Sequence, residues 1–272
     1  MTANNNKKTA FISGAAGGLG QQAAALFDKL GYRLWLSDFN QQQLDDLKQR
    51  YPDAIIDQTD LTDPQQLEAL CQVLEAYSDE LAIAYINAGI SLPGRVIDLQ
   101  RNQLKAQLDI NLNAAVFLMH ACAKKMAVQK SGHIIATAST AALISLQDGA
   151  PYSASKFGLR GFLIALAAEL KPLGISVSAL YPNAIDTPML RFEAANGGSS
   201  LNFLGDPLKP EQVIAALEKA LKGKKLEYFI PAADSLTARL VCTFPGLLNR
   251  FYPLLNWLGE KGRSKYLRSL KS

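Results

Sequence analysis

The sequence contains few of the residues that bind structural metals or form disulfides. Three cysteines and two histidines occur among 272 residues, and neither His120 nor His133 has a cysteine or carboxylate at the spacing of a metal ligand. Cys71, Cys122 and Cys242 lie far apart in apolar surroundings, and a chain of this length does not need disulfides for stability. We therefore expect reduced thiols in the core, no structural zinc site and no metal-dependent catalysis.

Long apolar runs are also lacking. No stretch of about 18 residues is free of charges and helix-breaking residues, and the N-terminal segment Met1–Lys8 is polar. We therefore expect neither a membrane-spanning helix nor a secretory signal, and a cytoplasmic location. The composition is 49% hydrophobic and 19% charged, with a mean hydropathy of +0.03, which is typical of a globular chain and excludes a disordered or fibrous protein.

Positive charge is concentrated at one end of the chain. The formal net charge is +4, but residues 239–272 carry seven basic side chains against Glu260, a balance of +6, so residues 1–238 carry −2. A dispersed charge of −2 provides no basic stripe, which argues against nucleic-acid binding. The seven basic residues are Arg239, Arg250, Lys261, Arg263, Lys265, Arg268 and Lys271.

Short β-branched or aliphatic runs alternate with longer segments of helical periodicity. Runs such as Ile83–Ile86 are continuously apolar, as expected for strands covered on both faces of a parallel sheet. We predict a doubly wound α/β fold in one domain, residues 1–238, followed by an extension, residues 239–272. The predicted strands are Thr9–Ser13, Arg33–Ser37, Ala54–Asp57, Leu81–Ile86, His133–Ala138, Ser176–Tyr181 and Leu226–Ile230.

Local signals mark where several helices and loops begin. Asp63 before Pro64 predicts an N-cap with proline in the first helical turn, and Pro210 opens a helix that continues towards Lys222. The segment Asn196–Ser200 is rich in glycine and serine, and we expect it to be a mobile loop.

A glycine-rich segment, Ser13–Gly20, follows the first predicted strand and precedes a helix expected over Gln21–Leu30. In this context glycines let the backbone turn tightly and approach a pyrophosphate, whose charge the helix N-terminus then meets. Gly14, Gly18 and Gly20 are the candidates for this role. A glycine cluster in an ordinary turn is the alternative interpretation.

Asp38 ends the second predicted strand, 24 residues after Gly14. A carboxylate at this position can accept hydrogen bonds from both ribose hydroxyls of a dinucleotide and would repel a 2′-phosphate. No Lys or Arg follows at Phe39 or Asn40 or occurs over Ala15–Gly17, so we predict a preference for NAD over NADP. The alternative is that Asp38 only forms the turn after the strand.

Tyr152 and Lys156 are four residues apart in Pro151–Leu170, a segment with helical periodicity, so both side chains project from one face. A lysine ammonium stabilises a phenolate, and we expect it to lower the pKa of Tyr152 from the usual tyrosine value near 10. This makes Tyr152 a candidate general acid or base.

Together these motifs resemble those of the short-chain dehydrogenase/reductase family over about Lys8 to Leu190. The segment Ser13–Gly20 is similar to the family's Thr-Gly-x-x-x-Gly-x-Gly pattern, with Ser13 in place of the threonine. The other matching positions are Asp60, Leu61, Asn87, Ala88, Gly89, Asn111, Ser139 at 13 residues before Tyr152, and the stretch from Pro182 to Thr187.

The resemblance implies a Rossmann fold and a catalytic set. In this set Tyr152 is the proton donor or acceptor, and Ser139 holds the substrate oxygen. Lys156 modifies the tyrosine pKa and binds the nicotinamide ribose, and Asn111 is part of a water relay. The implied cofactor contacts are Ser13, Gly14, Gly18, Leu19, Gly20, Asp38, Asp60, Leu61, Asn87, Ala88, Gly89, Tyr152, Lys156, Pro182 and Thr187.

Three positions leave alternatives open. Ser139 and Asn111 can also be interpreted as a polar residue at a strand end and a satisfied buried amide. Asn183 departs from the family, in which glycine usually follows the proline. Because asparagine tolerates positive φ better than most residues, we expect only a slightly different backbone course beside the nicotinamide.

Apolar residues surround the candidate catalytic residues, which favours a lipophilic alcohol or ketone as substrate. We therefore predict an NAD(H)-dependent alcohol dehydrogenase or carbonyl reductase. The alternatives are a non-catalytic dinucleotide-sensing or interaction protein on the same fold, and an NADPH-dependent carbonyl reductase. The apolar residues are Leu143, Ile144, Leu146, Met189, Leu190 and Phe192.

The extension after Arg239 combines aromatic and basic residues, and Pro245, Gly246 and Pro253 interrupt its apolar run. It should not span a bilayer. Contact with a membrane surface, cover over the substrate entrance, and packing on its own domain or a partner subunit are the open interpretations. The resemblance also implies a homodimer or homotetramer formed through the helices that hold Asn111 and Tyr152.

Overall fold

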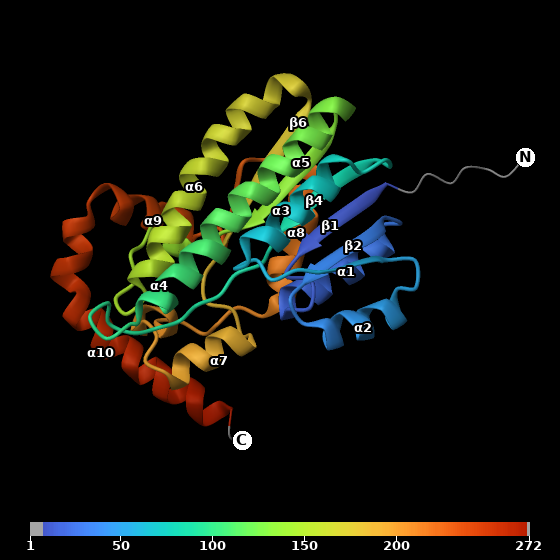
Figure 1. The fold of residues 1–272 in the computed structure, drawn as a ribbon. Coiled ribbons are helices and arrows are strands. Elements are labelled where there is room, and N and C mark those ends of the chain that lie inside the picture. The colour runs from blue at the N-terminus through green and yellow to red at the C-terminus, as the bar shows by residue number, and fades with distance from the viewer. Residues whose placement is uncertain (1–7, 271–272) are drawn as a thin grey trace, which may run out of the picture.

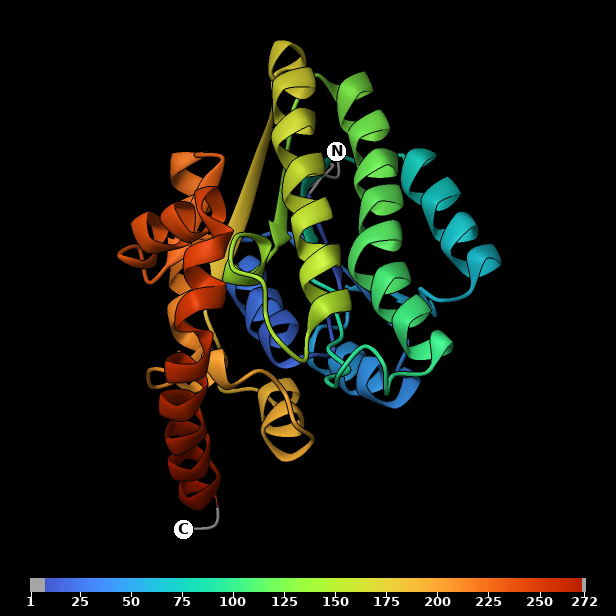
Figure 2. The same ribbon diagram turned by 90° about the vertical axis from the view of Figure 1, so that its left-hand side faces the viewer.

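The computed structural model describes residues 8–270 and shows a seven-stranded parallel sheet between two layers of helices (Figures 1 and 2). Most of Met1–Lys8 and the basic residue Lys271 lie outside the described range. The strand order is β3-β2-β1-β4-β5-β6-β7. The strands are β1 (Thr9–Ser13), β2 (Arg33–Asp38), β3 (Ile55–Gln58), β4 (Leu81–Ile86), β5 (Gly132–Thr137), β6 (Ile175–Pro182) and β7 (Glu227–Ile230).

The helices follow the strands in the alternation that the sequence predicts. The α-helices are α1 (Gly18–Lys29), α2 (Gln41–Arg50), α3 (Pro64–Glu75), α4 (Arg101–Leu108), α5 (Ala115–Gln129), α6 (Ala150–Leu170), α7 (Pro188–Ala195), α8 (Pro210–Gly223), α9 (Asp234–Thr243) and α10 (Pro245–Ser269). A π-helical segment, η1 (Asp109–Ala114), joins α4 to α5, and short 3-10 turns are η2 (Thr140–Ala142), η3 (Lys171–Leu173) and η4 (Ser200–Phe203).

Two apolar cores lie on opposite faces of the sheet. Helices α3, α5 and α6 cover one face, over Phe11 and Trp35 among others. Helices α1, α2 and α8 cover the other face, where Tyr85 is fully buried. Cys71 and Cys122 are free thiols of the first core. Burial on both faces accounts for the continuously apolar strands, and the predicted doubly wound fold is confirmed.

The strand order reverses between β1 and β4, which lie side by side although two strands separate them in sequence. Loops that leave the carboxyl ends of such neighbours diverge to opposite faces and leave a crevice between them. All seven predicted strands are present, with ends shifted by at most one residue. The predicted N-cap is also present, because the Asp63 carboxylate accepts hydrogen bonds from the N–H groups of Gln65 and Gln66.

Two local expectations are wrong. Helix α1 begins at Gly18 rather than Gln21, so two of the three candidate glycines belong to its first turn. The segment Asn196–Ser200 is held in place and is not a free loop, because Ser199 and Ser200 are buried and Gly198 lies against Glu193. Its composition is that of a flexible loop, but packing against α10 overrides this tendency.

The extension is also more regular than its composition suggests. Helix α9 crosses the predicted boundary at Arg239, and α10 continues through Gly246 and Pro253 without a break (Figure 2). Proline removes one hydrogen bond from the interior of a helix. Pro253 lies on the exposed side of α10, and the opposite side of this helix packs on the domain. None of the helices in residues 8–270 combines the length and apolar character needed to cross a membrane.

Helix α10 lies so close to η4 that a side chain at the α10 positions facing η4 would clash with the η4 backbone. A Cβ atom at Gly262 would lie 1.9 Å from the Phe203 carbonyl oxygen, and one at Gly259 would lie 2.2 Å from the Ser200 carbonyl oxygen. Around these glycines Leu190, Ala194 and Phe203 form a small third core. The extension therefore packs on its own domain through a glycine face.

We predict that Gly262→Ala destabilises the protein by roughly 1–3 kcal/mol, because the added methyl group meets backbone atoms that cannot rotate away. Gly246→Ala is the matched control in the same helix, since nothing lies within 4 Å of the position that its added methyl group would take. Calorimetric unfolding and limited proteolysis measure the effect. Equal unfolding temperatures for the two variants would contradict the close contact.

Candidate active site

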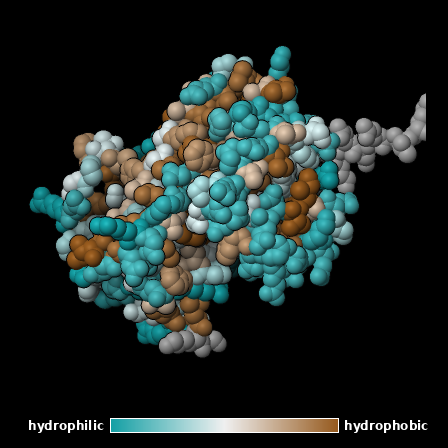
Figure 3. Space-filling model, in the orientation of Figure 1, coloured by the Kyte–Doolittle hydropathy of each residue, from teal (hydrophilic) through white to brown (hydrophobic). Residues whose placement is uncertain are grey.

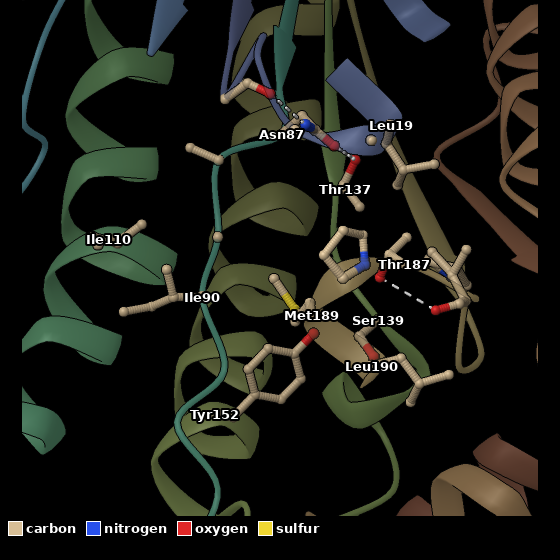
Figure 4. Close-up of a pocket in the computed structure, with 18 of the residues that line it drawn as sticks. Leu19, Asn87, Ile90, Ile110, Thr137, Ser139, Tyr152, Thr187, Met189 and Leu190 are labelled. Atoms are coloured by element: carbon tan, nitrogen blue, oxygen red, sulfur yellow. Dashed lines mark hydrogen bonds between the residues drawn. The ribbon is translucent and has the colours of Figure 1, made fainter. Parts of the chain in front are cut away.

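A cavity of about 590 Å³ opens at the carboxyl ends of the strands, where the strand order reverses (Figure 4). Its volume is in the range of ligand-binding pockets. The cavity brings together fourteen predicted site residues from seven segments of the chain. They are Gly14, Gly18, Leu19, Asp38, Asp60, Leu61, Asn87, Ala88, Gly89, Ser139, Tyr152, Lys156, Pro182 and Thr187. Ser13, Gly20 and Asn111 are not among its lining residues.

The glycine turn after β1 depends on the absence of side chains. Gly14 has φ +67°, and a Cβ atom there would lie 2.8 Å from the Ala88 Cα atom. A Cβ atom at Gly20 would lie 2.1 Å from the Gly14 carbonyl oxygen. Gly17 caps α1 without a side-chain hydrogen bond, so the first N–H groups of the helix remain available for an anion. This cradle fits the pyrophosphate of a dinucleotide.

Ser13 and Asn87 hold the glycine turn against the end of β4. The Ser13 hydroxyl oxygen accepts hydrogen bonds from the N–H groups of Asn87 and Ala88 at 3.1 and 3.3 Å. The Asn87 side chain donates to the Gly14 carbonyl oxygen at 3.2 Å. Ser13 is thus a positioning residue at the base of the cavity.

The Asp38 carboxylate lines the cavity where β2 ends. Its two oxygens accept hydrogen bonds from the N–H groups of Ala16 at 3.0 Å and Asn40 at 3.2 Å. It therefore forms the turn after β2, and it also keeps free acceptor sites toward the cavity, since a carboxylate accepts about four hydrogen bonds. Lys156, in the opposite part, is the one basic residue among those that line the cavity within residues 8–270.

Tyr152 and Ser139 meet in the other half of the cavity, and Figure 4 shows both hydroxyls beside Met189 and Leu190. The Ser139 side chain lies close enough to the Tyr152 phenol to lower its pKa, and the Ser139 hydroxyl oxygen accepts from the Ala141 N–H at 3.1 Å. Tyr152 lies in the first turn of α6, and Ser139 follows β5. Two hydroxyls from separate elements therefore point at one place.

The expected effect of Lys156 on Tyr152 is corrected by the structure. Burial, the largest cause, and the nearby Glu193 carboxyl raise the pKa of Tyr152, while the Ser139 hydroxyl beside the phenol opposes them. The Lys156 ammonium lies 5.6 Å from the centre of the Tyr152 ring and donates to the Thr137 carbonyl oxygen at 3.1 Å. Burial lowers the pKa of Lys156 to about 8.

Asn111 lies in the π-helical segment η1 and is buried. Its side-chain oxygen accepts from the Ile90 N–H, and its side-chain nitrogen donates to the Ile90 carbonyl oxygen, both at 2.8 Å. These bonds fix the strand-like segment after Gly89. The satisfied-amide interpretation therefore describes the Asn111 side chain in this structure.

Asn183, the position where the family usually has glycine, does not use positive φ, since Lys130, Asp148 and Lys224 are the described non-glycine residues that do. Instead its N–H donates to the Ile230 carbonyl oxygen at 2.9 Å, and its side chain donates to Asp234 at 3.1 Å. Asn183, in place of the family's glycine, therefore connects the end of β6 to the start of α9 through its side chain.

Two polar residues of the cavity have no motif in the sequence. Glu193 on α7 and Asn202 on η4 both line the cavity, and the Asn202 side chain donates to a Glu193 carboxylate oxygen at 2.7 Å. The one available signal is a single acidic residue within the apolar segment 189–195. Only the packing of α10 on η4 brings Asn202 to this wall.

Helix α10 braces both segments that flank Tyr152 and Ser139. Its Tyr252 hydroxyl accepts from the Gln147 N–H at 2.6 Å, and its Asn256 side chain donates to the Gln147 side chain at 2.9 Å. Its Tyr266 hydroxyl donates to the Asp186 carboxylate at 2.6 Å. The inner face of the extension thus packs on its own domain and supports the wall of the cavity.

Comparison with known proteins agrees with this geometry. The profile of the short chain dehydrogenase family matches residues 8–197. The chain is 30% identical to a cyclohexanol dehydrogenase of Acinetobacter sp. strain SE19 over 227 residues, which is 80% of this chain and 90% of the relative. The family match ends before α8, so it leaves the extension outside.

Solved structures share the fold. A short chain dehydrogenase/reductase from Burkholderia phymatum in complex with NAD superimposes with a TM-score of 0.77 and 24% identity, covering 89% of this chain and 95% of that one. A short-chain dehydrogenase from Sphingobium yanoikuyae in complex with NADPH gives a TM-score of 0.76 and 24% identity, with the same coverage. The family profile and the Acinetobacter relative, supported by the common fold, establish that this chain belongs to the short-chain dehydrogenase/reductase family.

Proposed function

We propose that the protein is an NAD(H)-dependent alcohol dehydrogenase or carbonyl reductase that acts on a lipophilic alcohol or ketone. The observation that carries the proposal is that the Ser139 and Tyr152 hydroxyls lie together at one wall of the cavity, with the buried Lys156 ammonium beside them. The cyclohexanol dehydrogenase relative supports an alcohol as substrate.

The hydroxyl pair performs the proton half of the reaction. In the reductive direction Ser139 donates a hydrogen bond to the substrate oxygen, and Tyr152 transfers its proton to that oxygen as negative charge develops there. A bound nicotinamide cofactor would supply the hydride for the carbonyl carbon, and in the opposite direction its oxidised form would accept the hydride. In that oxidative direction the Tyr152 phenolate takes the proton of the alcohol.

The protonation states in the structure are suited to reduction. The raised pKa of Tyr152 keeps the phenol protonated at neutral pH, which is the form that donates a proton. The Lys156 ammonium stabilises the phenolate left behind and, in the role that the family resemblance implies, holds the ribose of the cofactor. Asn111 acts on the site through the Ile90 backbone.

The two competing functions are disfavoured by particular residues. A non-catalytic dinucleotide-sensing or interaction protein has no need for Ser139 and Tyr152 to be paired in the cavity. An NADPH-dependent carbonyl reductase needs a cation beside the 2′-phosphate of its cofactor. At the position that we assign to this phosphate, the cavity wall has the Asp38 carboxylate instead. We therefore retain NAD as the preferred cofactor.

The outer face of the extension supports contact with a membrane surface. Apolar side chains of α9 and α10 remain exposed on the side away from the domain, and basic residues follow them along the helix (Figure 3, lower left). Such a face suits the interface of an anionic membrane. The exposed apolar residues are Leu236, Leu240, Phe244, Phe251, Leu254, Trp257 and Leu258, and the exposed basic ones include Arg250, Lys261, Lys265 and Arg268.

We also propose that the protein forms a homodimer or homotetramer, with an interface formed by the helices around the active site. Phe117 on α5 and Phe157 and Ile164 on α6 are apolar and exposed on this layer. A cytoplasmic location, with peripheral contact at the inner face of a membrane, is consistent with this assignment of surfaces.

We predict that NAD(H) binds more tightly than NADP(H), and that Asp38→Ala reduces this preference by about 1–3 kcal/mol because the ribose hydroxyls lose an acceptor. Asp45→Ala, which changes an exposed carboxylate outside the cavity, is the control. Calorimetric titration of both cofactors measures the difference. Equal or tighter NADPH binding by the unmodified protein would refute the assignment.

We predict that Tyr152→Phe lowers turnover by about 10²–10⁴-fold, because it removes the transferable proton and keeps the ring. NADH binding, followed by fluorescence, should stay nearly unchanged. Oxidation of cyclohexanol and reduction of cyclohexanone provide the assay, and Tyr51→Phe, outside the cavity, is the control. Near-normal turnover by the Tyr152 variant would show that another group carries the proton.

We predict that the protein sediments with anionic liposomes, and that this binding weakens as salt rises, since each basic residue near an anionic surface contributes about 1 kcal/mol. The double variant Lys261→Glu with Arg268→Glu should abolish it, while Lys171→Glu with Lys219→Glu, on the domain, should not. These changes spare the inner face of α10, which a truncation would remove. No sedimentation of the unmodified protein would leave α10 as a purely structural element.

A further inference from the structure

A buried carboxyl group faces the substrate half of the cavity. Glu193 is 8% exposed and lines the cavity together with Tyr152 and Leu190. One carboxylate oxygen accepts from the Asn202 side chain at 2.7 Å, and the Ser91 side chain is near enough to lower the pKa of the carboxyl. Ionisable side chains are rarely buried to this degree unless they are paired or perform a role in a site.

The hydrogen-bonding capacity of this pair is not exhausted. A carboxylate can accept about four hydrogen bonds, and within residues 8–270 the Asn202 side chain is the donor that lies within hydrogen-bond distance of Glu193. The Asn202 side-chain oxygen has no hydrogen-bond partner within residues 8–270, although Asn202 also lines the cavity. Glu193 and Asn202 therefore both have acceptor oxygens at the cavity wall, and residues 8–270 do not supply a donor for every one of these oxygens.

The charges around Glu193 are compatible with a ligand. No ion pair involves it in the described part of the chain, and Arg263 of α10 donates instead to the Gly198 carbonyl oxygen and pairs with Glu260 at 3.2 Å. Burial raises the pKa of Glu193, and the more distant Arg263 opposes this effect. The carboxyl is also near enough to Tyr152 to raise the pKa of that phenol.

We propose that Glu193 and Asn202 form a polar subsite that binds a second hydrogen-bond donor of the substrate, a hydroxyl or an amine. This inference rests on the proposed function. The substrate is then a bifunctional molecule, with a reacting alcohol or ketone at Ser139 and Tyr152 and a donor group that reaches the wall formed by α7 and η4. The apolar residues of the cavity contact the hydrocarbon between the two groups.

A purely structural role explains the observations less well. To tie α7 to η4, Glu193 needs only the bond to Asn202, which an amide could also make. Burying a carboxylate that no ion pair within residues 8–270 neutralises costs free energy, and a donor group of a ligand in the cavity would offset this cost. A site built to hydrogen-bond a ligand group discriminates strongly against an analogue that lacks it.

The test compares three probes of nearly equal size: 4-methylcyclohexanol, cyclohexane-1,4-diol and 4-aminocyclohexanol. With NAD⁺, the unmodified enzyme should oxidise the diol or the amino alcohol with a kcat/KM about ten- to hundredfold above the methyl compound. Glu193→Leu should remove this preference, so that the kcat/KM values of the three probes lie within about threefold of one another. Glu193→Gln should weaken the amino alcohol more than the diol if the donor is an ammonium group, and both alike if it is a hydroxyl.

The controls separate the subsite from the proposed function. Glu169→Leu, on the exposed side of α6, should change none of the three rates. If no probe is oxidised, the proposed function fails, and calorimetric binding of the same probes to the enzyme with NAD⁺ still tests the subsite. An unmodified enzyme that prefers the methyl compound, or a Glu193→Leu variant that lowers all three alike, would overturn the proposal.

Discussion

The site depends on one chain of hydrogen bonds that crosses the carboxyl ends of β1, β4 and β5. The Gly14 carbonyl accepts from the Asn87 side chain at 3.2 Å, and the Asn87 side-chain oxygen accepts from the Thr137 hydroxyl at 3.1 Å. The Thr137 carbonyl in turn accepts from the Lys156 ammonium at 3.1 Å. The glycine turn and the buried ammonium are thereby held at fixed positions, so the two halves of the cavity form one rigid site.

The substrate half is built differently, from segments that the common sheet does not fix. The segments around Gln147 and Asp186 have few strand contacts, and α10 supports them through Tyr252 and Tyr266. The glycine face of α10 lets η4 approach and places Asn202 against Glu193. The family match ends at residue 197, so it includes Glu193 but not Asn202 or α10, on which this wall depends.

Burial opposes the simplest electrostatic argument about Tyr152 and Lys156. A lysine four residues after a tyrosine suggests a lowered phenol pKa, but Tyr152 loses its water and faces Glu193, and these effects prevail. The same burial lowers the pKa of Lys156 to about 8. Each member of the pair is thus shifted toward its neutral form, which is the usual response of an ionisable group to a low dielectric.

The sequence by itself determined the elements whose signals are local: the seven strands, the glycine turn, the N-cap at Asp63 and the helical face that carries Tyr152 and Lys156. These follow from periodicity, backbone freedom and capping, which act over a few residues. Only the tertiary structure decided that the Asn111 amide is bonded to Ile90, that α10 continues through Pro253, and that Glu193 faces the cavity. Desolvation, close packing and charge proximity depend on residues far apart in the chain, and no local pattern records them.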